Sequence, residues 1–282
     1  MEMRDGIALV AGASRGLGRA LARFLAAEGA RLVLPWYDWP EDCAELVQEF
    51  GGADSAHLTT RRDLRDPEQV RALAAEIAAR YGRLSILINN IERGGMPVVH
   101  GPYERTVNRE QWRLEWETTL GAKQLLFRHC LPLLRKSPQG AVVNISSIAG
   151  LVGRSGPAAQ LFNDGYAAAN RAVSSLTETW AREAAPNIRV NELMLGLFAT
   201  RHAEGTRGWD LLTAAQQQAL REHTLLERNG RLEEAVAAVR YLLREADFMT
   251  GAVLRLDGGY VLGQDRVPPM PPGIDLAEPE ER

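Results

Sequence analysis

The sequence predicts an α/β fold: a Rossmann-type doubly wound parallel sheet of about seven strands, with helices on both faces. Short apolar runs alternate with helical patterns along the chain, as in sheets whose strands are joined by crossover helices. The first run, Ile7–Val10, passes into a glycine-rich turn and then into apolar residues at helical spacing. The runs are nearly continuous in apolar residues, which is typical of strands buried on both faces.

Each element is predicted from its local pattern. Short apolar runs predict strands, in chain order over residues 7–10, 31–34, 57–60, 84–88, 141–145, 188–193 and 253–256. Apolar residues at helical spacing predict helices, in chain order over residues 17–29, 43–50, 67–81, 110–134, 166–185 and 233–244. Pro35 is expected to close the second strand, and Pro67 stands at the start of its helix. Residues 198–227 carry helical signals but no strand.

Composition and length favour one domain. No linker or internal repeat divides the 282 residues, so residues 1–263 are predicted to form a single domain. Residues 264–282 are rich in Pro, Asp and Glu, which predicts an extended or disordered tail. A net charge of −3 gives no argument for a nucleic acid or membrane partner. Cys43 and Cys130 have no ligand-like spacing, so neither a disulfide nor a metal site is expected, and the cytoplasm is the predicted compartment.

Three glycines stand where the first strand becomes a helix. Gly12, Gly16 and Gly18 permit a tight turn and a close approach of the backbone to a pyrophosphate. The N–H groups at the helix start then face the anion. The alternative is that the glycines only make a tight connection between strand and helix. Their place after the first strand of a βαβ chain favours nucleotide binding.

The spacing Gly-x-x-x-Gly-x-Gly resembles that of the short-chain dehydrogenase/reductase family, and five later segments continue the resemblance. They are, in chain order, Asp63-Leu64, Asn89-Asn90, Asn144–Ser147, Tyr166–Asn170 and Met249–Gly259. They are similar to the adenine-contacting Asp, the Asn-Asn-Ala-Gly signature, the catalytic serine segment, the Tyr-x-x-x-Lys motif and the Asp-Gly-Gly ending. The matches run in order over residues 7–260.

The resemblance implies an NAD(P)-dependent oxidoreductase and assigns roles to matching positions. Tyr166 would transfer the proton and Ser147 would orient the carbonyl oxygen. The family's lysine position is Asn170, and its asparagine position, counted from Trp112, is Thr119. The residues expected to bind the cofactor are Gly12, Ser14, Arg15, Gly16, Leu17, Gly18, Asp63, Leu64, Asn89 and Asn170.

Two of the four catalytic roles are therefore changed. A tyrosine with an ordinary pKa near ~10 stays mostly neutral at pH 7 without an adjacent cation. A neutral phenol still donates a proton to a developing alkoxide, so reduction would persist while alcohol oxidation would suffer. Either Arg171, next to Asn170, or Lys123, one turn past Thr119, is a candidate for the missing cation. The alternative for Lys123 is a solvated or interface lysine.

Two further departures leave alternatives open. The expected Ala-Gly after Asn90 is Ile91-Glu92, followed by Arg93-Gly-Gly95. The charged pair either binds substrate or is an ordinary ion pair. The interval between Ser147 and Tyr166 is longer than is usual in the family. Its extra residues, 154–164, predict a loop that either shapes a substrate pocket or is a tolerated surface insertion.

The choice between NAD and NADP depends on two positions. In the family, an acidic residue at the end of the second strand selects NAD. Here that position lies near Trp36, with Tyr37 and Asp38 following. Arg15 stands where relatives that prefer NADP often carry a basic residue. NADP is therefore favoured, with NAD as the alternative.

The leading hypothesis is a carbonyl reductase for a small carbonyl or alcohol substrate. Residues 198–227 would form the substrate lid, and the helices at 110–134 and 166–185 would form a homodimer or homotetramer interface. A second hypothesis is a cofactor-binding protein with impaired turnover, acting as a sensor or assembly subunit, because Thr119 and Asn170 replace catalytic residues. A third is a redox-neutral enzyme of the same family. The retained Gly12, Gly16 and Gly18 speak against it.

Overall fold

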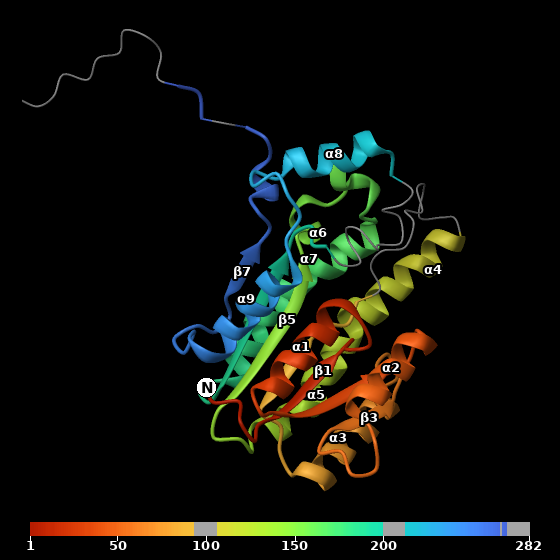
Figure 1. Ribbon diagram of the computed structural model, residues 1–282, viewed down its shortest axis with the longest axis vertical. Coiled ribbons are helices and arrows are strands. Elements are labelled where there is room, and N and C mark those ends of the chain that lie inside the picture. Colours follow the sequence, from red (N-terminus) through yellow and green to blue (C-terminus); the bar gives the residue numbers. More distant parts are fainter. Residues whose placement is uncertain (93–105, 200–211, 266, 270–282) are drawn as a thin grey trace, which may run out of the picture.

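The computed structural model describes residues 1–92, 106–199, 212–265 and 267–269. Seven parallel strands form one sheet with the order β3-β2-β1-β4-β5-β6-β7 (Figure 1). The strands are β1 (Ile7–Ala11), β2 (Arg31–Trp36), β3 (Leu58–Arg61), β4 (Ile86–Asn89), β5 (Gly140–Ser147), β6 (Ile188–Leu195) and β7 (Val253–Leu256). This order confirms the predicted doubly wound fold. The chain first adds β2 and β3 on one side of β1, and then returns to the other side of β1 to add β4 and the later strands.

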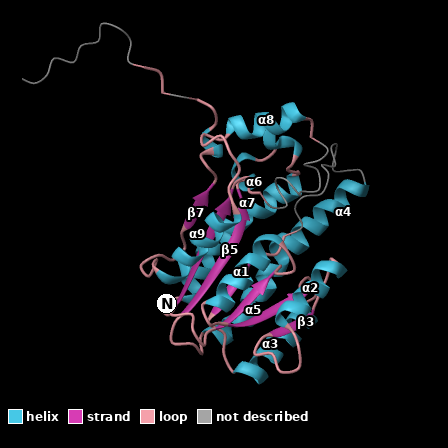
Figure 2. Ribbon diagram, viewed as in Figure 1, coloured by secondary structure: helices cyan, strands magenta, loops and turns pink. Residues whose placement is uncertain are grey.

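Helices cover both faces of the sheet (Figure 2). Helices α1 (Gly16–Ala27), α2 (Pro40–Phe50) and α9 (Leu232–Arg244) pack into one apolar cluster with one face. Helices α3 (Pro67–Tyr81), α5 (Ala122–Leu134) and α7 (Asp164–Ala184) pack into the other. The remaining α-helices with described bounds are α4 (Thr106–Glu115), α6 (Ala149–Val152) and α8 (Ala214–His223). Within the described ranges, no helix is long and apolar enough to cross a membrane.

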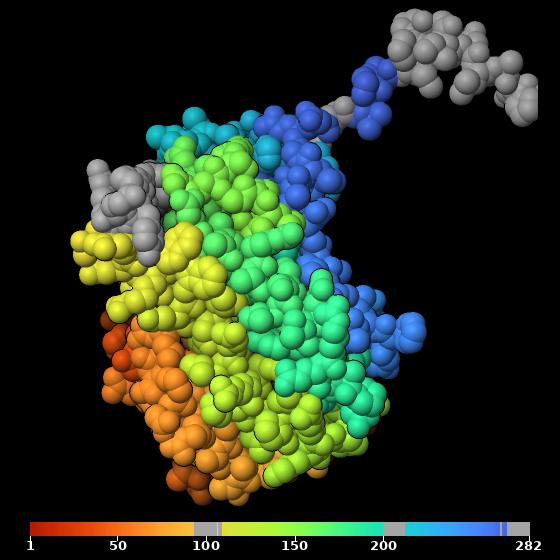
Figure 3. Space-filling model, turned by 180° about the vertical axis from the view of Figure 1, so that it is seen from behind, coloured from red at the N-terminus to blue at the C-terminus, as the bar shows by residue number. Residues whose placement is uncertain are grey.

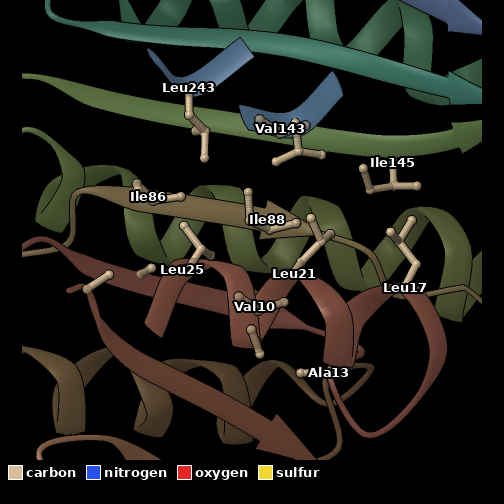
Figure 4. Packing of buried hydrophobic residues seen from close by; sticks show 14 of the residues in the cluster. Val10, Ala13, Leu17, Leu21, Leu25, Ile86, Ile88, Val143, Ile145 and Leu243 are labelled. Atoms are coloured by element: carbon tan, nitrogen blue, oxygen red, sulfur yellow. The ribbon is translucent and has the colours of Figure 1, made fainter. Parts of the chain in front are cut away.

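The α1 face shows how sequence periodicity becomes packing. Leu17, Leu21 and Leu25 recur every four residues and therefore point to the same side of α1. Figure 4 shows them directed at the strands, where they meet side chains such as Val10 and Ile88. Burying each such side chain contributes about 1.5–3 kcal/mol. This packing fixes α1 directly after the glycine-rich turn, so the turn itself is held in place.

Several predicted boundaries were wrong by a few residues. Strand β2 does not close at Pro35 but continues through Trp36, because the Trp36 carbonyl accepts a bond of 2.9 Å from the Arg62 amide and the ladder resumes. Helix α2 begins at Pro40 rather than Cys43, with the proline in its first turn. Apart from the helix predicted over 110–134, the other strands and helices shift by two residues or fewer. The division into a domain and a tail stays a prediction, since most of residues 264–282 lie outside the described residues.

The helix predicted over 110–134 is not one continuous α-helix. It begins at Thr106, changes to a π-helical turn over Trp116–Gly121 and returns to α geometry in α5. A π turn holds one extra residue and is often found at functional sites. Hydrophobic periodicity alone does not reveal it, because the apolar pattern continues on both sides. The turn contains Thr119, one of the predicted site residues.

The segment 154–164, predicted to be a loop, contains a 3-10 helix over Pro157–Gln160. Ala158 and Phe162 are buried in one cluster with Tyr166 and Tyr260. The Ala158 amide donates a hydrogen bond of 2.9 Å to the Tyr260 hydroxyl. The segment therefore packs beside Tyr166 through Ala158, Leu161 and Phe162, while its first residues, 154–156, are exposed. The lid predicted at 198–227 is described only in part, because residues 200–211 lie outside the described residues. Its described part contains helix α8.

Candidate functional site

The glycine-rich turn leaves no room for side chains at two positions. Gly12 has a φ of +72°, and a Cβ atom there would lie 2.8 Å from the Asn90 carbonyl oxygen. A Cβ atom at Gly18 would lie 2.0 Å from the Gly12 carbonyl oxygen. The Asn90 side chain donates a hydrogen bond of 3.2 Å to that same oxygen. The end of β4 therefore holds the turn after β1.

A buried arginine fixes the same turn from the other side. Arg19 donates hydrogen bonds of 2.8 Å to the carbonyl oxygens of Ser14 and Asp42, and one of 2.8 Å to the Glu49 carboxylate. These bonds connect the turn to α2. Sequence reasoning missed Arg19. The signal was a charged residue directly after Gly18 in an apolar helix, where a buried arginine needs several acceptors.

The start of α1 fits a diphosphate. Arg15 is the N-cap in extended geometry, and its side chain makes no capping hydrogen bond to the described helix start. At Gly16, with a φ of +54°, an added Cβ atom would meet nothing within 4 Å. The backbone is therefore open on this side, where the first-turn N–H groups and the helix dipole favour an anion. Gly12, Gly16, Gly18 and the backbone of Ser14 and Leu17 therefore form an open cradle whose polar groups suit a pyrophosphate.

Aromatic and basic side chains gather beyond the end of β2. The Arg15 guanidinium lies 3.7 Å from the centre of the Trp39 ring and 3.9 Å from the Asp42 carboxylate. Arg65 lies over the Tyr37 ring at 5.7 Å. A guanidinium that lies over an aromatic ring keeps its N–H donors in its own plane, where they can still reach a phosphate. The side chain that ends β2 is Trp36, which carries no charge.

Asp63 and Leu64 follow β3 as predicted, but Asp63 already has a partner. Its carboxylate accepts two hydrogen bonds from the Arg65 guanidinium, at 2.9 and 2.7 Å, and one from the Arg65 amide. These contacts hold the pKa of Asp63 below its ordinary value, although burial opposes them. Leu64 is buried. A base-contacting role for Asp63 would require that it share or exchange the Arg65 contacts.

Asn89 joins a buried polar network between strands and helix. Its side chain donates to the Asn144 side chain at 2.8 Å, and Asn144 donates to the Thr177 hydroxyl at 2.8 Å. Asn89 Oδ1 is buried and accepts no hydrogen bond from the described residues. An unsatisfied buried acceptor is costly, so it marks a place where a ligand hydroxyl or a water would be stabilised.

The serine and tyrosine segments are brought together by a short helix. Ser147 ends β5, and its hydroxyl accepts a hydrogen bond of 3.1 Å from the Ala149 amide at the start of α6. Helix α6 lies directly on α7, since a Cβ atom at Gly150 would stand 2.8 Å from the Arg171 amide nitrogen. Only glycine permits this approach. Ala149 and Tyr166 belong to one buried cluster.

Tyr166 lies in the first turn of α7, two residues after the helix begins. The helix begins at Asp164, and the Asn163 side chain caps it by accepting a 2.7 Å hydrogen bond from the Tyr166 amide. Asn163 in turn donates to the buried Glu115 of α4 at 3.2 Å. The Tyr166 hydroxyl donates a hydrogen bond of 2.8 Å to Glu92 Oε2. Glu92 therefore contacts the predicted catalytic tyrosine, while its neighbour Arg93 lies outside the described residues.

Asn170, at the family's lysine position, is fully buried. Its amide nitrogen donates a hydrogen bond of 3.0 Å to the Tyr166 carbonyl oxygen, one turn earlier. Its Oδ1 atom is buried and has no hydrogen-bond partner among the described residues. The side chain supplies no charge, but this oxygen can accept a hydrogen bond from a hydroxyl group, such as that of a ribose. An unsatisfied buried acceptor is costly, so a donor from a water or a ligand hydroxyl would stabilise this oxygen.

Lys123 is buried, with only 1% of its surface exposed. The alternative interpretation, a solvated or interface lysine, is therefore wrong. Its ammonium donates hydrogen bonds of 2.6 Å to the Ile91 carbonyl oxygen and 2.8 Å to the Thr119 carbonyl oxygen, within the π turn. Burial lowers the pKa of Lys123 to about 8, although attraction to Glu92 and Glu192 opposes this. Arg171, the other candidate cation, is exposed.

Glu192 is a buried acid that sequence reasoning missed. It lies on β6 and accepts hydrogen bonds from the hydroxyls of Ser146 and Ser174. Burial raises the pKa of Glu192, although these bonds and the charges of Lys123 and Arg171 oppose it. A glutamate inside an apolar strand was the available signal. Among the described residues, no group of three or more His, Cys, Asp or Glu is placed to hold a metal ion.

We expect Lys123→Met to change the sign of its stability effect with pH. Below pH 8 the folded chain buries a charge, and the shift from 10.5 to about 8 corresponds to about 3 kcal/mol. Methionine avoids this cost but leaves two carbonyls without a donor, at about 1 kcal/mol each. The variant should therefore be more stable than the parent by about 1 kcal/mol at pH 7.

Between pH 8 and 10.5 the unfolded lysine holds more proton than the folded one, so the parent gains stability as pH rises. Above that range the variant should be less stable by about 2 kcal/mol, the value of the two lost hydrogen bonds. Urea unfolding at pH 7 and pH 10.5 measures both values. Lys136→Met, at an exposed position after α5, is the control and should show no crossover. The same sign at both pH values would contradict a charged, buried Lys123.

Known proteins are similar to this chain over most of its length. The family described as Enoyl-(Acyl carrier protein) reductase matches residues 12–261. Cis-4-hydroxycyclohexanecarboxylate dehydrogenase of Sinomonas cyclohexanicum is 33% identical over 90% of this chain and 96% of its own length. The 3-oxoacyl-(acyl-carrier-protein) reductase of Thermotoga maritima is 29% identical over 93% and 100%. The aldohexose dehydrogenase of Thermoplasma acidophilum superposes with a TM-score of 0.73 at 26% identity, over 96% of this chain and 98% of its own.

Proposed function

Since this chain belongs to the short-chain dehydrogenase/reductase family of NAD(P)-dependent oxidoreductases, we propose that it reduces the carbonyl group of a small molecule to an alcohol. Tyr166 is the proton donor and Ser147 the hydroxyl that orients the carbonyl oxygen. The observation that carries the proposal is their arrangement. The elements of both residues meet at α6, at the carboxyl edge of the sheet that also bears the glycine cradle.

The residues divide the work by their chemistry. The cradle of Gly12, Gly16 and Gly18 and the buried oxygen of Asn170 would hold the dinucleotide, which supplies the hydride when bound. The Ser147 hydroxyl donates to the carbonyl oxygen and polarises it. The Tyr166 hydroxyl gives its proton to the developing alkoxide. The packed segment 154–164 excludes water from the side of Tyr166.

The test is a titration with NADH and NADPH followed by their fluorescence, and then assays of carbonyl reduction. A suitable panel is 4-oxocyclohexanecarboxylate, cyclohexanone, an aldohexose lactone and an acetoacetyl thioester, chosen because relatives act on hydroxycyclohexanecarboxylate, aldohexose or 3-oxoacyl groups. We expect binding of a reduced dinucleotide and turnover of at least one carbonyl compound. Binding without any turnover would favour the sensor or assembly subunit, and absence of binding would favour redox-neutral chemistry.

We further propose a preference for NADP over NAD. Trp36 ends β2 where an acidic residue would repel a 2′-phosphate, and the Arg15 guanidinium lies over the Trp39 ring, three positions later in the chain. A charge-assisted hydrogen bond from Arg15 to the phosphate is worth about 1.5–3 kcal/mol. We therefore expect Arg15→Ala to weaken NADPH binding by about 10- to 100-fold and to leave NADH binding nearly unchanged.

The fluorescence titration of the Arg15→Ala variant with both dinucleotides measures this ratio. Arg71→Ala removes an exposed arginine on α3, outside the cradle, and is the matched control. An equal loss of affinity for NADH and NADPH in Arg15→Ala would show that the guanidinium does not read the 2′-phosphate. The role of Arg15 in a preference for NADP would then be wrong, and the ratio of the parent's two affinities would decide between NAD and NADP.

A homodimer or homotetramer is also proposed, in the cytoplasm. Helices α4, α5 and α7 lie side by side on the face seen in Figure 3, as a yellow to green surface. Long helices of this kind offer a broad contact surface, and stable homodimers commonly bury more than about 2,000 Å². Light scattering coupled to size exclusion measures the mass of the assembly. A monomer at micromolar concentration would contradict this proposal.

A further inference from the structure

The tyrosine hydroxyl faces a carboxylate where the family's lysine would be expected to act. We propose that Glu92 is a further catalytic residue, which exchanges a proton with the Tyr166 hydroxyl during each turnover. This inference rests on the proposed function. Its geometric basis is the hydrogen bond of 2.8 Å from Tyr166 Oη to Glu92 Oε2, made by a tyrosine that is only 2% exposed. Glu92 is half-buried, and a pair at this distance is within range for direct proton transfer.

The charges around Glu92 come from several elements. Lys123 of α5 is buried and is attracted to Glu92, and its ammonium bonds the carbonyl oxygen of the residue before Glu92. Glu192 of β6 shares the attraction of Lys123, and Arg171 of α7 acts on Glu192. Glu115 of α4 is buried and bonds Gln111, Thr119 and Asn163. Lys123 is therefore the positioning residue that keeps Glu92 ionised, from α5 instead of from the position of Asn170.

The proton balance determines which reaction, oxidation or reduction, each protonation state of Glu92 supports. In alcohol oxidation the substrate O–H bond breaks and its proton moves to Tyr166 Oη, while the Tyr166 proton moves to Glu92. The substrate carbon loses its hydride to the oxidised dinucleotide, and Glu92 finally releases the proton to solvent. In reduction Glu92 must first take up a proton, which replaces the one that Tyr166 gives to the alkoxide. Ionised Glu92 therefore supports oxidation, and protonated Glu92 supports reduction.

This step revises the expectation that oxidation would suffer without a cation beside the tyrosine. A carboxylate is a base at neutral pH, so Tyr166 does not have to lose its proton to solvent before it accepts another. We expect the rate of oxidation to rise, and the rate of reduction to fall, as Glu92 ionises. Removal of the Lys123 charge makes that ionisation harder. It should therefore move both profiles to higher pH.

The kinetic test uses Glu92→Gln, whose amide oxygen still accepts the Tyr166 hydrogen bond but takes up no proton. With 4-hydroxycyclohexanecarboxylate, cyclohexanol, an aldohexose or a 3-hydroxybutyryl thioester as the alcohol, we expect kcat for oxidation to fall by about 10²–10³-fold and its pH profile to flatten. Dinucleotide affinity, measured by fluorescence, should change less than threefold. Glu117→Gln, an exposed glutamate in the π turn, should behave like the parent. A parent-like pH profile in Glu92→Gln would overturn the proposal.

A second readout needs neither dinucleotide nor turnover. Infrared difference spectroscopy follows the C=O stretch of the protonated Glu92 carboxyl during a pH titration, and Glu92→Gln identifies the band by its loss. Tyr166→Phe removes a hydrogen bond that favours the carboxylate, so it should raise the midpoint. Lys123→Met should raise it as well. A midpoint that is unmoved in Tyr166→Phe would show that the contact does not couple the two groups, and would overturn the proposal.

The two failures are distinguishable. If the parent chain turns over no alcohol or carbonyl compound, the proposed function fails, and a catalytic role for Glu92 fails with it. If the parent turns over a substrate and Glu92→Gln does so with the same rate and pH profile, only the role of Glu92 is wrong. Glu92→Gln could also lose activity because it does not fold. Circular dichroism and the measurement of dinucleotide binding distinguish that cause from the loss of a proton acceptor.

Discussion

Tyr166→Phe should lower the rate of carbonyl reduction by about 10²–10⁴-fold, the usual contribution of a positioned general acid. Phenylalanine keeps the ring that packs against Phe162 and removes only the hydroxyl. The residual rate would come from the hydride donor held in place and from the Ser147 hydroxyl. Single-turnover kinetics with NADPH and an excess of the carbonyl substrate measure the chemical step directly.

The control for Tyr166→Phe is Tyr81→Phe. Tyr81 ends α3, and its hydroxyl donates a hydrogen bond of 2.9 Å to the Ala56 carbonyl oxygen. Its loss should cost about 1 kcal/mol of stability and none of the rate. Because Tyr166→Phe keeps the backbone of α7 and the Asn163 cap, its dinucleotide affinity should match that of the parent. An unchanged reduction rate in Tyr166→Phe would remove the tyrosine from the mechanism.

Gly18→Ala should weaken dinucleotide binding by at least about tenfold and lower the free energy of unfolding by about 1–3 kcal/mol. The added methyl group would stand 2.0 Å from the Gly12 carbonyl oxygen and 2.7 Å from the Asn90 side chain. The first of these is backbone, so the strand-to-helix turn itself must shift. That shift would move the amides at the start of α1 away from the diphosphate.

Gly82→Ala separates the two consequences of Gly18→Ala. Gly82 ends α3 with a φ of +74°, and an added Cβ atom meets nothing within 4 Å. Its replacement should cost about 1–2 kcal/mol through backbone strain alone. Chemical denaturation and fluorescence titration of both variants give the comparison. If Gly82→Ala weakened dinucleotide binding as much as Gly18→Ala, the effect would come from general destabilisation and the cradle assignment would be wrong.

Local patterns were sufficient to predict most of the fold. Continuous apolar runs gave the strands, because a parallel strand buried on both faces has no polar side, and Leu17, Leu21 and Leu25 gave α1 by their spacing. Features that depend on an extra residue or on long-range contacts were not predicted. The π turn at Trp116–Gly121 leaves hydrophobic periodicity almost unchanged. The 3-10 helix over Pro157–Gln160 depends on burial of Ala158 and on the distant Tyr260.

The candidate site shows the same division. The glycine turn, Ser147 and Tyr166 are contiguous motifs, so their places were predictable from the chain alone. The burial of Lys123 was not, because a lysine on a helix is usually exposed. One of its two acceptors is the Ile91 carbonyl after β4, which is 32 positions away, and the other is the Thr119 carbonyl one turn earlier. Glu92 was visible only as a departure from a signature. Its contact with Tyr166 joins residues 74 positions apart, which no local pattern specifies.

The π-helical turn also accommodates one surplus amino acid without misaligning the two halves of the helix. Deleting one position between Trp116 and Gly121 would remove that surplus and restore ordinary α geometry, with α4 and α5 kept in their present relative orientation. Glu115 would then keep its contact with Asn163, and the change would fall on the turn itself, which carries the Thr119 carbonyl that accepts from Lys123. A one-residue change in length here thus acts on the anchorage of the buried lysine and leaves the rest of the long helix in place.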